Sequence, residues 1–233
     1  MFRDRVDAGR RLACALEKYR GSGALVLAIP RGGAVVGDEV ARHLEADFSL
    51  VVSRKLPFPA DPESGFGAIA EDGSVFIHEA AARWVARDEA EEIARAQRNE
   101  IRRRIRALRG GRPLPPIQGR TVILVDDGIA MGSTMRASIM LCRRAGAGRI
   151  VAAAPVAGPD VARAIGREAD EAVILEIPED FHAVAQAYAD WHDLSDKEVL
   201  ELMRRWEKPP NVARHGGETD RGGGGGGVRE RVR

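Results

Sequence analysis

The chain has few cysteines and no strong charge of either sign. Only two cysteines occur among its 233 residues, Cys14 and Cys142, and they form no C-x-x-C pair. The sequence therefore offers neither a disulfide framework nor a cysteine-based zinc site. We expect both to be buried helix residues in a reducing compartment. Lys and Arg together number 36 against 35 Asp and Glu. This balance provides no overall attraction for a polyanion, so a phosphate site must be built locally.

Long apolar runs are also missing. No run reaches the roughly 20 residues needed to cross a bilayer, and the charged start Met1–Arg5 lacks the apolar core of a signal sequence. We therefore expect a cytoplasmic protein without a membrane partner. Hydrophobic residues make up 44% of the chain, which is enough for one full core. Apolar content falls from Pro209 onward, so we predict a single domain over 1–208 and a disordered Gly-rich tail over 209–233.

Strand-like and helix-like segments alternate along that domain. Buried strands are predicted at 24–29, 48–53, 121–126, 149–154 and 172–177. Helices are predicted at 3–19, 34–44, 80–109, 133–145 and 159–167, and a C-terminal helical part over 178–206 has helices near 182–190 and 196–206. The Pro/Gly-rich stretch 54–79 predicts an inserted loop with a hairpin at Asp72-Gly73. The alternation indicates an α/β fold, a doubly wound parallel sheet with helices on both faces.

The most informative segment is 122–134, which reads V-I-L-V-D-D-G-I-A-M-G-S-T. Four aliphatic residues lead into Asp126 and Asp127 at the carboxyl end of a strand, where open α/β sheets bind ligands. The glycines after them allow the backbone to approach a ligand closely. Ser133 and Thr134 can cap a helix whose first N–H groups bind an anion. The two carboxylates would repel phosphate but suit sugar hydroxyls or a hydrated divalent cation.

Other interpretations of this segment fit less well. A Walker A loop needs four residues between its glycines and a Lys before Ser/Thr, whereas Gly128 and Gly132 are separated by three residues and no Lys follows. A dinucleotide fingerprint needs G-x-G-x-x-G after a strand, and Gly21-Ser22-Gly23 precedes one. The remaining alternative is a pair of acids that merely caps or solvates a strand end.

The segment resembles the ribose-phosphate motif of type I phosphoribosyltransferases. The resemblance implies that Asp126 and Asp127 hold the ribose hydroxyls of 5-phosphoribosyl-1-pyrophosphate (PRPP) and, indirectly, a Mg cofactor. It implies a 5-phosphate loop made of Gly128, Ile129, Ala130, Met131, Gly132, Ser133 and Thr134. It also implies a core strand order of 2-1-3-4-5, which places the loops after the first and third strands in one crevice, and a homodimer.

Two further segments fit the resemblance as pyrophosphate-binding elements. After the first strand, Pro30 to Gly33 forms a short loop in which Arg31, Gly32 and Gly33 would bind pyrophosphate, with a cis peptide expected at Arg31–Gly32. Lys55 is the candidate catalytic cation, with Arg54 beside it, at the expected end of the second strand. Two solvated cations are the alternative. The 54–79 insertion is expected to be mobile and to close over the site.

The acceptor is harder to predict. Ala130 stands where 6-oxopurine enzymes of the family carry an Asp, which argues against hypoxanthine or guanine. Phe181, His182 and Tyr188 are candidates for a base site, with Trp191 and His192 nearby, although packing is the commoner role of such residues. His43 and His78 are expected to be structural or exposed.

The stretches 2–9, 62–69 and 188–199 resemble a branch of bacterial phosphoribosyltransferases of undefined substrate. The predicted function is therefore Mg-dependent transfer of a phosphoribosyl group from PRPP to a nitrogen base with release of pyrophosphate. The alternative is a non-catalytic regulatory protein that senses PRPP or a nucleotide. The Arg-rich second half of 80–109 is better explained as a solvated or dimer-forming helix face than as an RNA-binding one, so nucleic acid is not an expected partner.

Overall fold

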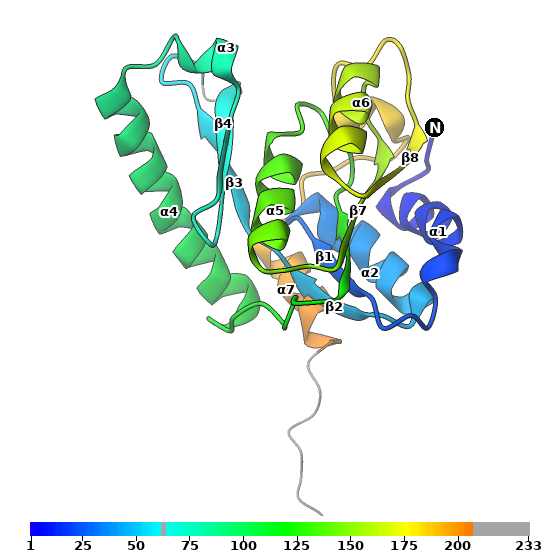
Figure 1. Ribbon diagram of the computed structural model, residues 1–233. Helices are drawn as coiled ribbons and strands as arrows, with labels where there is room; N and C mark the ends of the chain where they lie inside the picture. The colour runs from blue at the N-terminus through cyan, green and yellow to red at the C-terminus, as the bar shows by residue number, and fades with distance from the viewer. Residues whose placement is uncertain (62–63, 207–233) are drawn as a thin grey trace, which may run out of the picture.

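The computed structural model describes residues 1–61 and 64–206. The predicted tail 209–233 lies outside the described residues, as does Glu63 of the predicted mobile loop. The main sheet has the order β2 (Asp47–Leu50), β1 (Leu25–Ala28), β6 (Thr121–Val125), β7 (Arg149–Val156) and β8 (Glu171–Glu176), and every neighbouring pair is parallel. The predicted doubly wound sheet with order 2-1-3-4-5 is confirmed (Figure 1).

Alternate side chains of the central strands point to opposite faces of this sheet, as a period of two requires. Val26 and Ile123 pack into one cluster with helices α1 (Arg5–Ala15), α2 (Gly32–Leu44) and α7 (Asp196–Arg204). Leu25 and Val122 pack into another cluster with helices α5 (Ser133–Arg144) and α6 (Pro159–Glu168). Because both faces are covered, the central strands are unbroken apolar runs rather than alternating ones.

The structure differs from the predicted elements at several boundaries. The predicted helix 3–19 is α1 followed by a 3₁₀ turn over Glu17–Tyr19, and the helix predicted near 182–190 is only a 3₁₀ turn over Val184–Ala187. Cys142 is buried as expected, whereas Cys14 is exposed because it lies on the outer side of α1. Among the residues that the structure describes, no helix combines the length and apolar character needed to cross a membrane.

The largest departure concerns the predicted strand 48–53 and the insertion that follows it. The strand of the main sheet ends at Leu50, and a separate antiparallel sheet begins at Ser53, with strands β3 (Ser53–Pro57), β4 (Gly65–Ala70) and β5 (Val75–Ile77). The predicted hairpin turn at Asp72-Gly73 joins β4 to β5, with Gly73 at φ 89°. Glycine in this segment reflects strand packing, since a Cβ at Gly67 would lie 2.2 Å from the carbonyl oxygen of Phe76. The mobility of the insertion stays a prediction.

The second sheet lies between α5 and the long helix α4 (Arg87–Arg109), which follows the short helix α3 (Glu79–Ala82) (Figure 1). Leu56 and Ile69 pack with Ile101 of α4, whereas Ala68 on the opposite face packs with Met135 of α5. The second sheet therefore packs one face on α4 and the other face on α5.

A buried ion pair joins the second sheet and α4 to the main sheet. Arg109, at the end of α4, donates two hydrogen bonds to the Glu71 carboxylate, at 2.9 and 2.6 Å, and a third to the carbonyl of Leu50 at 2.8 Å. Both side chains are less than a tenth exposed. Helix α4, the end of β4 and the end of β2 are thus held at one point.

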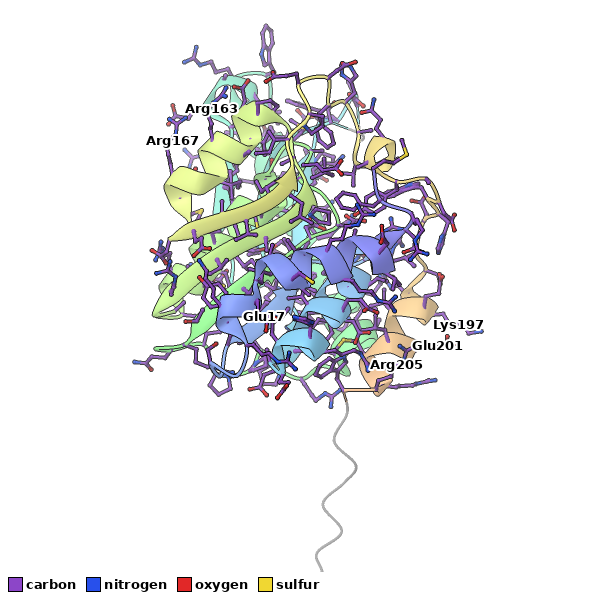
Figure 2. The ribbon with its side chains drawn as sticks, turned by 90° about the vertical axis from the view of Figure 1, so that its right-hand side faces the viewer. Glu17, Arg163, Arg167, Lys197, Glu201 and Arg205 are labelled. Carbon is purple, nitrogen blue, oxygen red and sulfur yellow. The ribbon has the colours of Figure 1, made fainter. Side chains whose placement is uncertain are left out.

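The C-terminal helix α7 closes the other side of the domain. The indole of Trp206 donates a hydrogen bond to the buried Asp38 carboxylate of α2 at 2.6 Å and packs against Phe48. Lys197 and Glu201 of α7 point away from the body of the protein (Figure 2). This docking places the start of α7, Asp196, next to the loop after β1.

Candidate functional site

A pocket lies at the carboxyl ends of the central strands, where the crossover order reverses and open α/β sheets bind ligands. Its lining comprises Lys55, Asp126, Gly128, Ile129, Ala130, Met131, Gly132, Ser133 and Thr134. The structure thus brings the entire predicted 5-phosphate loop together with one of the two acids and with the predicted catalytic lysine. Lys55 reaches the pocket from β3 of the second sheet, not from the end of a main-sheet strand.

The loop between β1 and α2 lies directly against the two acids. A Cβ on Gly32 would be 1.7 Å from Oδ2 of Asp127, and a Cβ on Gly33 would be 2.9 Å from the Cα of Asp126. Only glycine permits this approach of backbone to side chain. The predicted proximity of the two loops is therefore present in the structure.

The cis peptide of this loop lies at Pro30–Arg31, one peptide before the expected position at Arg31–Gly32. Helix α2 begins at Gly32, two residues before the predicted start at 34. The Arg31–Gly32 peptide therefore leads directly into the first helical turn.

The two acids face different partners. Asp126 lines the pocket, and its Oδ1 accepts a hydrogen bond from the amide N–H of Asp127 at 2.9 Å. The Asp127 carboxylate turns away and accepts a hydrogen bond from Nε of Arg5 at 2.7 Å. Arg5 also donates to the carbonyl of His192 at 2.9 Å and lies 3.8 Å from the centroid of the Trp191 ring.

These surroundings act on the charge of Asp126. Burial, and then the neighbouring charge of Asp127, raise the pKa of Asp126 well above its usual 3.8. The hydrogen bond from the Asp127 amide and the charge of Arg5 offset only part of this shift. A cation or a hydrogen-bond donor that enters the pocket would therefore favour the ionised form of Asp126.

The phosphate-loop end of the pocket is built on the start of α5. Gly132 has φ 77° and precedes the helix, so Ser133 is the first helical residue and does not form the expected side-chain cap. Its hydroxyl instead lies 3.0 Å from Nε2 of His78. The first N–H groups of a helix have no partner within it and carry partial positive charge, so this end of the pocket suits an anion.

Arginines gather beside the β1–α2 loop. Arg31 lies 3.8 Å from Asp196, which in turn lies 3.4 Å from Arg103 of α4. Burial, followed by the charges of Arg104 and others including Arg31, lowers the pKa of Arg54. Arg54 itself donates to the side chain of Gln97 on α4 at 3.2 Å. Neighbouring residues of a strand point to opposite faces, so Arg54 faces α4 whereas Lys55 faces the pocket.

The structure brings two of the three candidate base-site residues, Phe181 and Tyr188, into one apolar cluster, and none of the three lines the pocket that contains the loop 128–134. Phe181 lies beside Gly158, where a Cβ would be 3.3 Å from its ring. His182 is exposed and lies 2.7 Å from Asp180. Tyr188 is buried against Phe2, and its hydroxyl donates to the carbonyl of Asp127 at 2.5 Å.

Arg5 was not a candidate from the sequence, and His78, expected to be structural or exposed, instead contacts Ser133 of the pocket lining. Arg5 belongs to an amphipathic helix with several arginines, and nothing in that helix marks it as different from the others. Its partner Asp127 is 122 residues away in the sequence, so no local pattern indicates the contact. His78 follows a three-residue strand inside a stretch that predicts a loop. The signal for His78 is the short strand at 75–77, because a strand there makes His78 the residue that follows the second arm of the hairpin.

Comparison with known proteins is consistent with this geometry. Residues 4–191 match the family described as phosphoribosyl transferase domain. Two proteins of Mycobacterium tuberculosis, from strains CDC 1551 and H37Rv, carry the name "Putative phosphoribosyl transferase" and are each 40% identical to this chain over 207 residues, 88% of this chain and 47% of the relative. The chain therefore spans about half the length of these curated relatives.

A crystal structure from Thermus thermophilus, that of the protein TT1426, superimposes with a TM-score of 0.75. Its sequence is 38% identical to this chain, and the match covers 89% of this chain and 99% of that one. Nearly the whole of that solved chain thus has its counterpart here.

Proposed function

Because the chain belongs to the phosphoribosyl transferase family, we propose that it binds PRPP with Mg²⁺ and transfers the phosphoribosyl group to a nitrogen base, releasing pyrophosphate. One observation carries the proposal: a single pocket is lined by Lys55, Asp126 and all seven residues of the loop 128–134. These are the chemical groups that a sugar with a phosphate at one end and a pyrophosphate at the other requires. The expected homodimer and cytoplasmic location stay predictions.

The 5-phosphate and the ribose would occupy the two ends of this lining. The N–H groups at the start of α5 and the hydroxyls of Ser133 and Thr134 would donate to the 5-phosphate. Asp126 would accept a hydrogen bond from a ribose hydroxyl. Asp127 would accept a second hydroxyl through the lone pairs that Arg5 leaves, because Arg5 donates to Oδ2 alone.

The pyrophosphate would lie between Lys55 and the β1–α2 loop. Near Arg31 of this loop, four arginines lie beside two carboxylates, in addition to the two acids that the glycines of the loop approach: Arg31, Arg54, Arg103 and Arg104 with Glu100 and Asp196. An anion would relieve the mutual repulsion of these guanidinium groups. Arg31, with 39% of its side chain exposed, can exchange Asp196 for a ligand oxygen at little cost.

Asp126 and Asp127 fit a magnesium ion that is held mainly by PRPP oxygens and water, since carboxylates are preferred Mg²⁺ ligands and the raised pKa of Asp126 indicates that its charge is incompletely compensated. When bound, the metal would neutralise developing charge on the pyrophosphate. The residues of the chain would supply positioning and electrostatic stabilisation, with no covalent nucleophile. Lys55 and Arg31 would stabilise the negative charge of the departing pyrophosphate. Ala130 contributes no polar side chain, so the acceptor stays undefined.

The test is pyrophosphate release from PRPP with a panel of nucleobases, using Asp126→Asn/Asp127→Asn as the control. We expect turnover with at least one base and its loss in the double variant. One observation favours a second candidate, a regulatory protein that binds PRPP without turnover: Arg5 already occupies one of the two acids. Tight PRPP binding that the double variant loses, without turnover on any base, would support that candidate. If the wild-type protein does not bind PRPP at all, both are wrong.

A further inference from the structure

Among the residues that the structure describes, His78 is the one histidine hydrogen-bonded to the lining of the pocket, and the proposed reaction gives it no role. It lies directly after β5, and its Nε2 is 3.0 Å from the hydroxyl oxygen of Ser133. Ser133 is 7% exposed and lines the pocket at the start of α5. The second sheet thus supplies a titratable side chain to the end of the pocket where the 5-phosphate would bind.

The position of one proton decides what Ser133 can do. When Nε2 of His78 carries no proton, it accepts the hydroxyl proton of Ser133, which then has no proton left for a ligand. When Nε2 is protonated, it donates to Ser133 Oγ, and the hydroxyl proton is free to be donated to an anion. The tautomer or charge of His78 therefore sets whether Ser133 is a hydrogen-bond donor within the pocket.

The surroundings of His78 favour its neutral form while the pocket holds no anion. Its ring packs edge-on against Phe76, with centroids 4.8 Å apart, and Arg136 of α5 lies 3.8 Å from the centroid of that same Phe76 ring. Burial and then the charge of Arg136 lower the pKa of His78, and Glu168 of α6, the ion-pair partner of Arg136, opposes the shift. A phosphate dianion at Ser133 would act in the opposite direction.

The position of His78 is fixed by the strands of the second sheet. Its backbone N–H donates to the carbonyl of Phe66 in β4 at 2.9 Å. The register pairs Lys55 with Ala68 and Ala68 with Phe76, and His78 follows Phe76 by two residues. His78 and Lys55 therefore belong to the same face of the sheet, which is the face that α5 and the pocket contact.

We propose that His78 is a positioning residue of the phosphate subsite: its Nε2 proton turns the Ser133 hydroxyl toward the ligand, and binding of a phosphate monoester is coupled to protonation at Nε2. The proposal rests on the proposed function, because it assigns the 5-phosphate to the start of α5. When His78 becomes an imidazolium beside the bound phosphate, binding takes up one proton that the phosphate loop alone would not take up.

The experiment is calorimetric titration with PRPP and, separately, with ribose 5-phosphate near neutral pH, in two buffers of different ionisation enthalpy, which counts the protons taken up. The variants are His78→Gln, which keeps an N–H donor but does not titrate, and His78→Phe, which removes the donor. His43→Gln is the matched control, since His43 contacts Glu17 away from the pocket. Circular dichroism of each variant verifies the fold.

We expect His78→Phe to weaken binding of both ligands about tenfold, because the Ser133 hydroxyl loses the N–H donor that turns its proton toward the phosphate and the ligand loses a nearby imidazolium charge. His78→Gln should bind within about threefold of wild type but take up fewer protons, and His43→Gln should match wild type. Ser133→Ala should remove the difference between wild type and His78→Phe, because His78 acts through that hydroxyl.

Unchanged affinity in His78→Phe would overturn the positioning role of His78, and unchanged proton uptake in a folded His78→Gln would overturn its coupling to protonation. The two proposals fail in different ways. If the wild-type protein binds ribose 5-phosphate but not PRPP, the proposed function is wrong, and the ribose 5-phosphate titrations still decide on His78. If it binds neither ligand, both proposals are wrong.

Discussion

Asp127 and Arg5 form a salt bridge of 2.7 Å in which the two side chains are only 13% and 7% exposed. One of the two adjacent acids at the site is therefore neutralised by its own chain. The guanidinium also contacts the Trp191 ring, so the pair fastens both the first helix and the segment before α7 to the end of β6.

We predict that Arg5→Met lowers the free energy of unfolding by about 3 kcal/mol, because it leaves the Asp127 carboxylate buried without this cation. Chemical denaturation measures the loss. In Arg5→Met/Asp127→Asn most of the stability should return, since the uncompensated charge of Asp127 is then gone. Equal losses in the single and double variants would show that Arg5 stabilises the fold through packing on Trp191 instead.

Asp126 is predicted to lower stability at neutral pH. The folded protein raises the pKa of Asp126 above its unfolded value of 3.8, so the folded state binds its proton more tightly and loses relative stability as pH rises above 3.8. Asp126→Asn should therefore raise Tm by a few degrees near pH 7, where each 1 kcal/mol is worth about 2–4 °C in a domain of this size. Below pH 3.8 the advantage should disappear.

The same substitution should weaken PRPP binding about tenfold or more, because a ribose hydroxyl loses a charged acceptor. Thermal melts across pH, combined with a binding titration, measure both effects on one sample. A variant that is less stable than wild type at neutral pH would contradict the predicted cost of the buried carboxyl.

Gly32→Ala is predicted to abolish PRPP binding. Its Cβ would lie 1.7 Å from Oδ2 of Asp127, so either the acid or the β1–α2 loop must move. Gly166→Ala is the matched control, because Gly166 lies within α6 and the nearest described atom that a Cβ there meets outside its own helical turns is Cβ of Ala172, at 3.9 Å. The control should be more stable by about 0.5–1 kcal/mol, the helix propensity difference, and should bind as wild type does. Wild-type affinity in Gly32→Ala would contradict the close approach of the two loops.

The Arg109–Glu71 pair is predicted to hold the second sheet in place. Arg109→Met leaves the buried Glu71 carboxylate unpaired and should cost about 3–5 kcal/mol. If the pair fastens this sheet in particular, hydrogen exchange of the β3 and β4 amides should accelerate more than that of β6 and β7. Uniform acceleration would instead show that the pair stabilises the domain as one unit.

The strands of the main sheet follow from local patterns in the sequence, whereas their order and the contents of the pocket were implied by the resemblance to type I phosphoribosyltransferases. Unbroken apolar runs such as Val122–Val125 predict strands buried on both faces, and the strand order that the resemblance implies brings the loops after β1 and β6 together. The separation of Arg54 from Lys55 was not predicted, because it depends on both residues lying in a strand. Pro and Gly around that strand predict a loop, whereas Gly67 is required by the carbonyl of Phe76.

Long-range contacts lie beyond such patterns. The bond from Arg5 to Asp127 joins residues 122 positions apart, and Tyr188, which looked available to a base, uses its hydroxyl on the carbonyl of Asp127. Nothing in the local sequence distinguishes these side chains from surface or core residues. Only the packing of Arg5 and Tyr188 against the end of β6 shows what they contact.

The second sheet also has a consequence for which ligands the pocket can select. Lys55 of β3 lies opposite Phe76 of β5 across β4, and His78 follows Phe76 by two residues, so Lys55 and His78 are separated by roughly 9.5 Å across the sheet and about 7 Å along it. Because neighbouring strands of one sheet carry both residues, the register of that sheet sets the distance between their backbones. A ligand contacts Lys55 and the Ser133–His78 pair together only if its two negatively charged groups are separated by a similar distance. The pocket would therefore select ligands by the distance between their charged groups, independently of the base.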